Sequence, residues 1–318
     1  MNEHWGGWLS DAAGGLLLEL QGSPARRRKE RIVRGTFFAL AAVSVVVSAT
    51  IVLALIEEAV RFVSAIGLGD LWQRGWFPRR GIFDVRTILV GTLVVTGIGM
   101  LVAAPLGLGA AIYLSEYARP RIRKLLKPIL EIIAGIPSIV LGVFAFSWIN
   151  PQIVDRFLCG DASFFNLGAA GVGIGILVTP LVASIAEDAM RAVPLSLREG
   201  SYGLGARKRS TTLKIVFPAA ISGIVAAVIV GMSRAIGETM VVAMAGGATG
   251  GSLFSADYCQ PGQTMTGAMA ALAIGGDQVK GDVSAFQSLY FVGLVLFLLT
   301  LGLNVLSGRI VRRVRQKY

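Results

Sequence analysis

Histidine and cysteine are nearly absent from this chain of 318 residues, which contains one histidine, His4, and two cysteines. That scarcity excludes a zinc site with the usual cysteine and histidine spacing. The chain also has no GxxxxGK[ST] phosphate-binding loop, because its nearest segment, GLGARKRS at 203–210, differs in spacing and follows no predicted strand. No nucleophile is accompanied by a base and an orienting group. We therefore predict no enzyme activity, no metal site and no cofactor for this chain.

Charged residues are also scarce, at 15% of the sequence, against about 25% in soluble domains. Hydrophobic residues reach 54%, and the mean hydropathy is +0.69. Crossing a bilayer as a helix takes roughly 20 apolar residues. The sequence therefore predicts an all-α polytopic membrane protein with six transmembrane helices, near 35–57, 87–116, 129–149, 167–187, 216–249 and 283–307.

The net charge of +11 comes from basic residues that are concentrated in particular loops. This distribution predicts membrane topology rather than nucleic-acid binding. Lysine and arginine gather before the first span, after the second and fourth spans, and after the last. The loop after the first span is an exception, with five arginines between 61 and 86. We expect a cytoplasmic basic tail at 1–34, a transmembrane permease domain at 35–308 and a second cytoplasmic basic tail at 309–318. The apolar faces of the spans would contact membrane lipid.

Both cysteines, Cys159 and Cys259, lie in loops that this topology places outside the cytoplasm. A disulfide between them is one interpretation if that compartment is oxidising. Two unpaired thiols on the same side of the membrane are the alternative, because the sequence does not give the distance between their Cα atoms.

One hydrophilic segment, LREGSYGLGARKRSTTLKIVFPAA at 197–220, stands between two apolar spans. It contains Glu199, Gly200 and Ser201, then Gly205 after three residues, and Pro218 further on. This spacing resembles the cytoplasmic loop of ABC-importer permeases, which reads Glu-Ala-Ala, three residues, Gly, nine residues, Ile, one residue, Leu-Pro. Gly200, Ser201 and Phe217 depart from the commonest residues. The resemblance implies a coupling loop at 191–218, with a short helix over 195–204 that ends before Gly205 and docks on a separate ATPase.

The fifth predicted span contains a charged pair, Arg234 and Glu238. Residues four apart on a helix share a face and can pair. Counting from Pro218 at about 1.5 Å per residue, Arg234 lies roughly 24 Å along the helix, within the hydrocarbon region. Ionisable residues at that depth usually mark a transport path. The alternative is a structural pair that only sets helix register.

Three further motifs narrow the resemblance: RAIGET at 234–239, PSIVLG at 137–142 and PLGLGAAIYLSEYA at 105–118. Together they resemble the permease subunits of phosphate-specific ABC importers, the PstC and PstA types, over about 87–310. Met240 is closer to the PstC type. The resemblance implies a type I ABC-importer permease fold and a phosphate path that includes Arg234, Glu238 and Thr239. A guanidinium suits phosphate because it forms bidentate hydrogen bonds with its oxygens.

The implied partners are a second homologous permease chain, an ATP-binding ATPase dimer and an extracytoplasmic phosphate-binding protein. The implied location is the prokaryotic plasma (inner) membrane, with both termini in the cytoplasm. Two other functions stay open: a permease for another oxyanion such as sulfate, molybdate or tungstate, and a non-transporting membrane scaffold that senses phosphate.

Residues near the span ends are expected to be less important. Glu116, Glu131, Glu187 and Asp188 are predicted to be solvated or at headgroup level. Three tryptophans are predicted to lie in the aromatic belt of the membrane interface: Trp72, Trp76 and Trp148.

Overall fold

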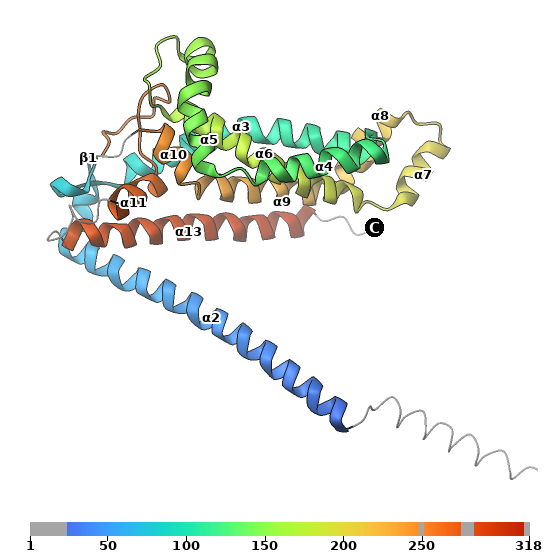
Figure 1. Cartoon of the computed structure of the whole chain (residues 1–318), viewed down its shortest axis with the longest axis horizontal. Helices are drawn as coiled ribbons and strands as arrows, with labels where there is room; N and C mark the ends of the chain where they lie inside the picture. The colour runs from blue at the N-terminus through green and yellow to red at the C-terminus, as the bar shows by residue number, and fades with distance from the viewer. Residues whose placement is uncertain (1–23, 248–250, 275–282, 315–318) are drawn as a thin grey trace, which may run out of the picture. The chain divides into compact units, whose positions relative to one another are not determined.

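A computed structural model describes residues 24–247, 251–274 and 283–314 of the chain (Figure 1). It divides into two units, 1–54 and 55–318. Six of its helical segments are long and apolar enough to cross a membrane, which confirms the predicted number of spans. They are Arg28–Ile66, Val85–Tyr117, Ser138–Cys159, Leu167–Arg191, Lys208–Ile236 and Ser284–Arg313.

The helices that build these spans differ in regularity. Three of them continue into π-helical turns, at Tyr113–Tyr117 after α3, at Ala145–Cys159 after α5 and at Thr212–Val216 after α8. The α-helices are α2 Pro24–Ile66, α3 Val85–Ile112, α4 Pro120–Ala134, α5 Ser138–Phe144, α6 Leu167–Arg191, α7 Leu195–Gly203, α8 Lys208–Thr211, α9 Phe217–Ile236, α10 Met240–Ala245, α11 Met265–Ile274 and α13 Val283–Val314.

In the unit 1–54, the described part of α2 from residue 28 onward has almost entirely exposed side chains. They are mostly apolar from residue 35 onward. An apolar helix whose described side chains are this exposed suits a surface covered by lipid or by another chain.

The core of the unit 55–318 forms where α3, α5 and α6 pack closely. Gly171 and Gly175 of α6 form a GxxxG pair that faces α3. A Cβ atom at Gly171 would lie 2.7 Å from the Cβ of Ile98, and one at Gly175 would lie 2.7 Å from the Cβ of Val102. The glycines therefore let the two helices approach closely.

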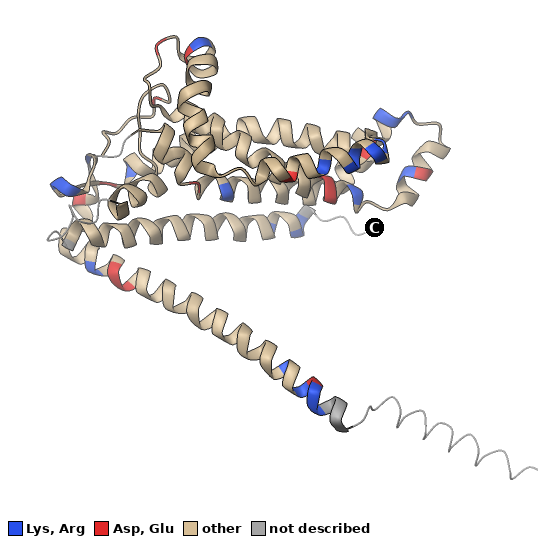
Figure 2. Ribbon diagram, viewed as in Figure 1, with Lys and Arg blue, Asp and Glu red and all other residues tan. Residues whose placement is uncertain are grey.

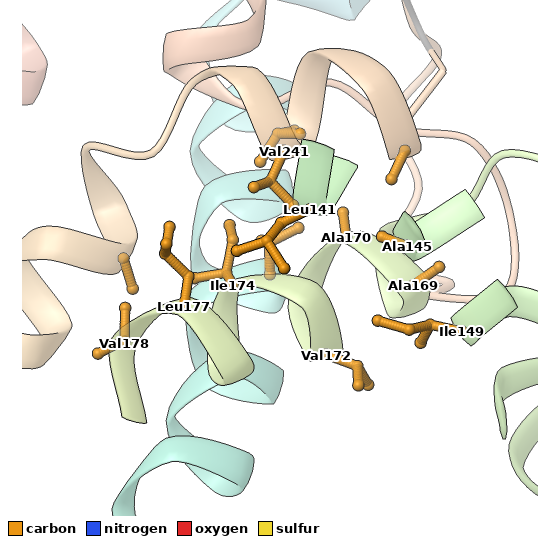
Figure 3. Packing of buried hydrophobic residues seen from close by; sticks show 14 of the residues in the cluster. Leu141, Ala145, Ile149, Ala169, Ala170, Val172, Ile174, Leu177, Val178 and Val241 are labelled. Carbon is orange, nitrogen blue, oxygen red and sulfur yellow. The ribbon is translucent and has the colours of Figure 1, made fainter. Parts of the chain in front are cut away.

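On the other side of α6, an apolar layer extends from α5 to α10 (Figure 3). Leu141 and Ala145 face Ala170 and Ile174 of α6, and Val241 of α10 joins them. These side chains are almost completely buried. The layer lies next to the point where α9 ends and α10 begins.

The third span begins later than the sequence predicted. Helix α4 ends at Ala134, and a new helix, α5, begins at Ser138. Pro137 separates them because it has no N–H to donate and disfavours helical backbone at the preceding residue. The predicted span 129–149 thus joined the end of α4 to the first half of the real span, which runs to Cys159.

The fifth predicted span, 216–249, is also wrong at both ends. Its helical run begins at Lys208, and α9 ends at Ile236, so that Gly237, Glu238 and Thr239 form a break before α10. The charged segment of this span therefore lies at an interruption of the helix. Broken helices within a membrane are tolerated where they are buried in protein or line a cavity.

A short antiparallel hairpin, which the sequence reading did not predict, follows α2. Strand β1, Trp72–Phe77, pairs with β2, Ile82–Asp84, and Trp72 lies opposite Asp84. Trp76 also exchanges backbone hydrogen bonds with Ser252, at 2.8 and 3.0 Å. Its side chain is completely buried, so the prediction that Trp76 lies in an interfacial belt is wrong.

Candidate functional site

The predicted coupling helix is present as α7, one residue shorter than expected. Gly205 follows it with φ of +77°, a left-handed backbone that favours glycine. The N–H of Gly205 donates to the carbonyl of Tyr202 at 2.9 Å, and the N–H of Ala206 donates to that of Ser201 at 3.1 Å. This pair of bonds is a Schellman motif, which satisfies the last carbonyls of the helix. The helix therefore has a well-defined end.

One surface of α7 and its cap is exposed and partly apolar. Glu199 and Gly200 are exposed, and no atom lies within 4 Å of the position where a Cβ of Gly200 would be. Leu204 is 91% exposed, and Leu195 and Tyr202 are exposed as well. An apolar side chain this exposed, at a tip between two spans, is typical of a surface that another protein covers.

Arg198 connects α7 to the membrane helices. Its Nη2 donates to Oε1 of Glu116 at 2.9 Å and to the carbonyl of Met190 at 2.8 Å, and its Nη1 donates to the carbonyl of Val193 at 2.5 Å. The side chains are 13% exposed for Arg198 and 4% for Glu116. The guanidinium thus joins α7 to the ends of α3 and α6. The prediction that Glu116 is solvated is wrong.

A second buried carboxylate, Glu187, connects α4 to α6. Nη2 of Arg123 lies 2.7 Å and Nζ of Lys127 lies 3.6 Å from it, and Nη1 of Arg191 lies 3.9 Å away. The side chain of Glu187 is almost fully buried, so its predicted solvation is also wrong; Asp188, in contrast, is exposed. Sequence reasoning missed both ion pairs, because Arg123 and Glu187 are 64 residues apart, and Arg198 and Glu116 are 82 apart.

The pKa of Lys127 reflects this environment. Burial opposes the charged form of the ammonium and lowers its pKa. The hydrogen bond to Asp188 and the charges of Glu187 and Asp188 outweigh that effect, so the pKa is raised from its ordinary value. Lys127 is therefore a permanent cation at neutral pH.

At the break between α9 and α10, Glu238 faces inward and Arg234 does not. The side chain of Glu238 is 4% exposed, whereas that of Arg234 is 56% exposed, and Nη2 of Arg234 lies 3.6 Å from Oε2 of Glu238. Oε1 of Glu238 accepts a hydrogen bond from the N–H of Met240 at 3.2 Å, and its carbonyl accepts one from Thr266 at 2.8 Å. Glu238 thus holds the break in place, with the arginine directed outward.

Thr239 is half-buried and its hydroxyl donates to the carbonyl of Gly237 at 3.3 Å. Thr239 and Gly237 also line a cavity of about 470 Å³, together with Met269, Phe286 and other apolar side chains of α11 and α13. Arg234 and Glu238 do not line it. A cavity with such walls would not compensate the charge of an anion. Because only Thr239 of the three predicted path residues lines it, the structure does not bring all three to this cavity.

The structure joins Cys159 and Cys259 in a disulfide, with their Cα atoms 5.9 Å apart. The carbonyl of Cys259 accepts from the N–H of Ser163 at 3.0 Å, and that of Tyr258 accepts from the N–H of Gly168 at 2.8 Å. Asn166 caps α6 by accepting from the N–H of Ala169 at 2.7 Å. The loop before α11 is thus attached to the start of α6.

Residues 103–316 match the family model described as "Binding-protein-dependent transport system inner membrane component". The chain belongs to this family. It is therefore a multi-pass inner-membrane component of a transport system.

Among curated relatives, the phosphate transport system permease protein PstC 1 of Mycobacterium tuberculosis is 32% identical over 256 residues, which cover 74% of this chain and 75% of that protein. PstC of Mesorhizobium japonicum is 28% identical over 302 residues, 90% of each chain. The resemblance to phosphate-importer permeases of the PstC type is confirmed.

Among solved structures, the MetNI methionine ABC transporter in an inward-facing conformation has a chain that aligns with a TM-score of 0.55 and 22% identity. The alignment covers 71% of this chain and 94% of that one. This similarity concerns the fold alone, and it confirms the predicted ABC-importer permease architecture.

Proposed function

We propose that this chain is one of two permease subunits of an ATP-driven phosphate importer. The observation that carries the proposal is the similarity, over 74–90% of the chain, to proteins named as phosphate transport permeases of the PstC type. A second homologous permease chain completes the path, and an extracytoplasmic phosphate-binding protein delivers the anion. A separate ATPase dimer supplies the energy.

The coupling surface is the exposed face of α7 with Leu204 at its tip. Lysine and arginine gather at the end of the unit 55–318 where α4, α7 and α8 lie, which supports a cytoplasmic location for that end (Figure 2). The ATPase docks on α7, and its movement reaches α3 and α6 through Arg198. Glu199, Gly200, Ser201 and Gly205 shape the docking surface, and Pro218 lies in the first turn of α9.

The anion-binding residue is Arg234. Within the described residues its nearest carboxylate is Glu238 at 3.6 Å, so most of its five N–H groups have no acceptor. A guanidinium with free donors can bind phosphate oxygens in a bidentate manner. Glu238 orients the guanidinium and limits how tightly the anion binds, which permits release. Thr239 sets the position of the break.

Uptake of labelled phosphate tests both parts of the proposal. Cells that lack this gene receive the wild-type chain, Arg234→Gln or the control Arg309→Gln, which removes an exposed arginine of α13. We expect wild type and the control to restore uptake, and Arg234→Gln to lose most of it at equal amounts in the membrane. Full uptake by Arg234→Gln would contradict the anion-binding role of Arg234 but would leave the proposed transport function standing.

Anion competition then tests the substrate. An excess of unlabelled phosphate should abolish the uptake, whereas sulfate, molybdate or tungstate should leave it unchanged. Inhibition by one of these anions instead would show that the chain carries another oxyanion. No uptake by wild type with its partners present would favour the phosphate-sensing scaffold.

Docking of the ATPase is tested separately by co-purification. Leu204→Asn should release the ATPase, because it removes the most exposed apolar side chain of the surface. The matched control is Leu253→Asn, an exposed leucine that follows Ser252, which hydrogen-bonds to Trp76 of β1. Strand β1 lies at the opposite end of the unit from α7 (Figure 1). Equal loss in both variants, or in neither, would contradict the assignment of α7 as the docking helix.

A further inference from the structure

A cavity of about 490 Å³ lies between α4 and the ends of α3 and α6. The coupling surface and the Arg234 region do not contribute to it. Its lining combines four cationic side chains with one acidic side chain and several apolar ones. The lining residues are Leu114, Ser115, Ala118, Pro120, Arg123, Lys124, Lys127, Pro128, Glu131 and Arg191.

Some cations of this cavity are paired with a carboxylate before any ligand arrives. Three of them, Arg123, Lys127 and Arg191, surround the single buried carboxylate of Glu187, at 2.7, 3.6 and 3.9 Å. Exposed Asp188 pairs with Lys127 at 3.3 Å, and Glu131 lines the cavity, so that four cations still outnumber three carboxylates. Positive charge therefore remains available at the cavity.

Two of the four cations are largely uncommitted. Lys124 is exposed and has no acceptor or carboxylate partner among the described residues. Arg191 is about half exposed, and its guanidinium lies 3.9 Å from Glu187, beyond hydrogen-bonding distance. Both side chains can therefore contact a bound anion without breaking an interaction that holds the fold.

The opposite face of α4 is apolar and exposed. Ile122, Leu125, Ile129 and Ile132 recur at helical spacing and are 40–70% exposed, and α4 has no fully buried residue. A helix with a basic face and an exposed apolar face lies in the plane of the membrane interface, its apolar side among the acyl chains. The cavity on its basic side is then at the depth of lipid phosphate groups.

We propose that this cavity binds the phosphate headgroup of an anionic phospholipid, with Lys124 and Arg191 as the contacting cations. The apolar row of α4 contacts the acyl chains of the same leaflet. Basic pockets beside transmembrane helices bind anionic headgroups in this way, each lysine or arginine near the surface contributing about 1 kcal/mol, or about a fivefold change in affinity. The assignment to the cytoplasmic leaflet rests on the orientation given in the proposed function.

Lipid binding to the full-length chain in detergent micelles tests the site. Phosphatidylglycerol and phosphatidylcholine with identical acyl chains are titrated in turn, and bound lipid is counted by native mass spectrometry. We expect tighter binding of phosphatidylglycerol by wild type. Lys124→Gln and Arg191→Gln should each weaken it about fivefold, and the double variant more than about tenfold, to the level of phosphatidylcholine.

The matched control is Arg121→Gln, which removes the same charge from an exposed position of α4 outside the cavity. It should retain the wild-type affinity. Equal affinity of wild type and the double variant, or an equal loss in Arg121→Gln, would overturn the proposal. Unchanged melting temperatures of the single variants exclude misfolding as the cause of a loss.

Inorganic phosphate distinguishes a lipid from a free anion. Millimolar phosphate that leaves phosphatidylglycerol bound supports the lipid as the occupant, whereas displacement at equal concentrations would assign the cavity to free phosphate and overturn the proposal. The binding assay involves no transport. A chain that failed to carry phosphate would still show this lipid selectivity, so the two proposals can fail independently.

Discussion

The two ends of the proposed coupling route use arginine and glutamate in opposite ways. Near α7, both partners are largely buried, and Arg198 is shared between Glu116 and two backbone carbonyls. At the break after α9, only the carboxylate is buried, and Arg234 stays exposed at 3.6 Å from it. The first arrangement pairs the two buried charges with each other and holds helices together. The second leaves cationic donors unused, as an anion-binding site requires.

The largest loss of stability is expected from Arg198→Ala. This change leaves Glu116 buried without its cation and removes donors from two carbonyls, so it should lower the free energy of unfolding by about 3–5 kcal/mol. Thermal unfolding in detergent measures it. Arg198→Lys keeps the charge but lacks the planar guanidinium with its several donors, so it should recover only part of the lost stability. If Arg198→Ala melted at the wild-type temperature, the Arg198–Glu116 pair would contribute no more to stability than the Arg234–Glu238 pair.

Removal of the disulfide is expected to have the next largest effect. Cys259→Ser opens a link between residues 100 apart, and should cost about 2–4 kcal/mol. The melting temperature should fall, and reductant should lower that of wild type to the same value. Reductant should not change the melting temperature of Cys259→Ser. A wild-type protein that is insensitive to reductant would show that the link contributes nothing to stability.

Close packing between α3 and α6 is expected to contribute less. Gly171→Ala places a Cβ within 2.7 Å of Ile98 and should cost about 1–3 kcal/mol. Gly109→Ala, in α3, is the matched control, because no atom lies within 4 Å of its added Cβ. That control should be neutral or slightly stabilising. Equal melting temperatures of the two variants would contradict the close approach.

The smallest effect on stability, about 0.5 kcal/mol or less, is expected from Arg234→Lys. Its side chain is exposed and its pair is long. Phosphate uptake should nevertheless fall, because an ammonium does not bind phosphate oxygens in a planar, bidentate manner. A large drop in the melting temperature of Arg234→Lys with unchanged uptake would contradict this expectation. The Arg234–Glu238 pair would then stabilise the fold, as the Arg198–Glu116 pair is expected to do.

Local patterns in the sequence predicted much of this architecture. Six apolar stretches gave the correct number of spans, since crossing a bilayer imposes length and composition on a single segment. The end of α7 was predicted because Gly205 has a backbone conformation that few other residues adopt. The third span was misplaced because hydropathy alone does not separate an amphipathic helix such as α4 from the span that follows Pro137.

The sequence by itself determined the membrane class, the number of spans, the short helix α7 between two spans and the presence of charge in the fifth span. Each of these depends on residues within one segment. Only the tertiary structure decided that Glu116 and Glu187 are buried, that Arg234 is exposed at a helix break, and that Cys159 meets Cys259. Burial and pairing depend on which distant segments pack together, and the spacing of residues along one chain segment does not specify that.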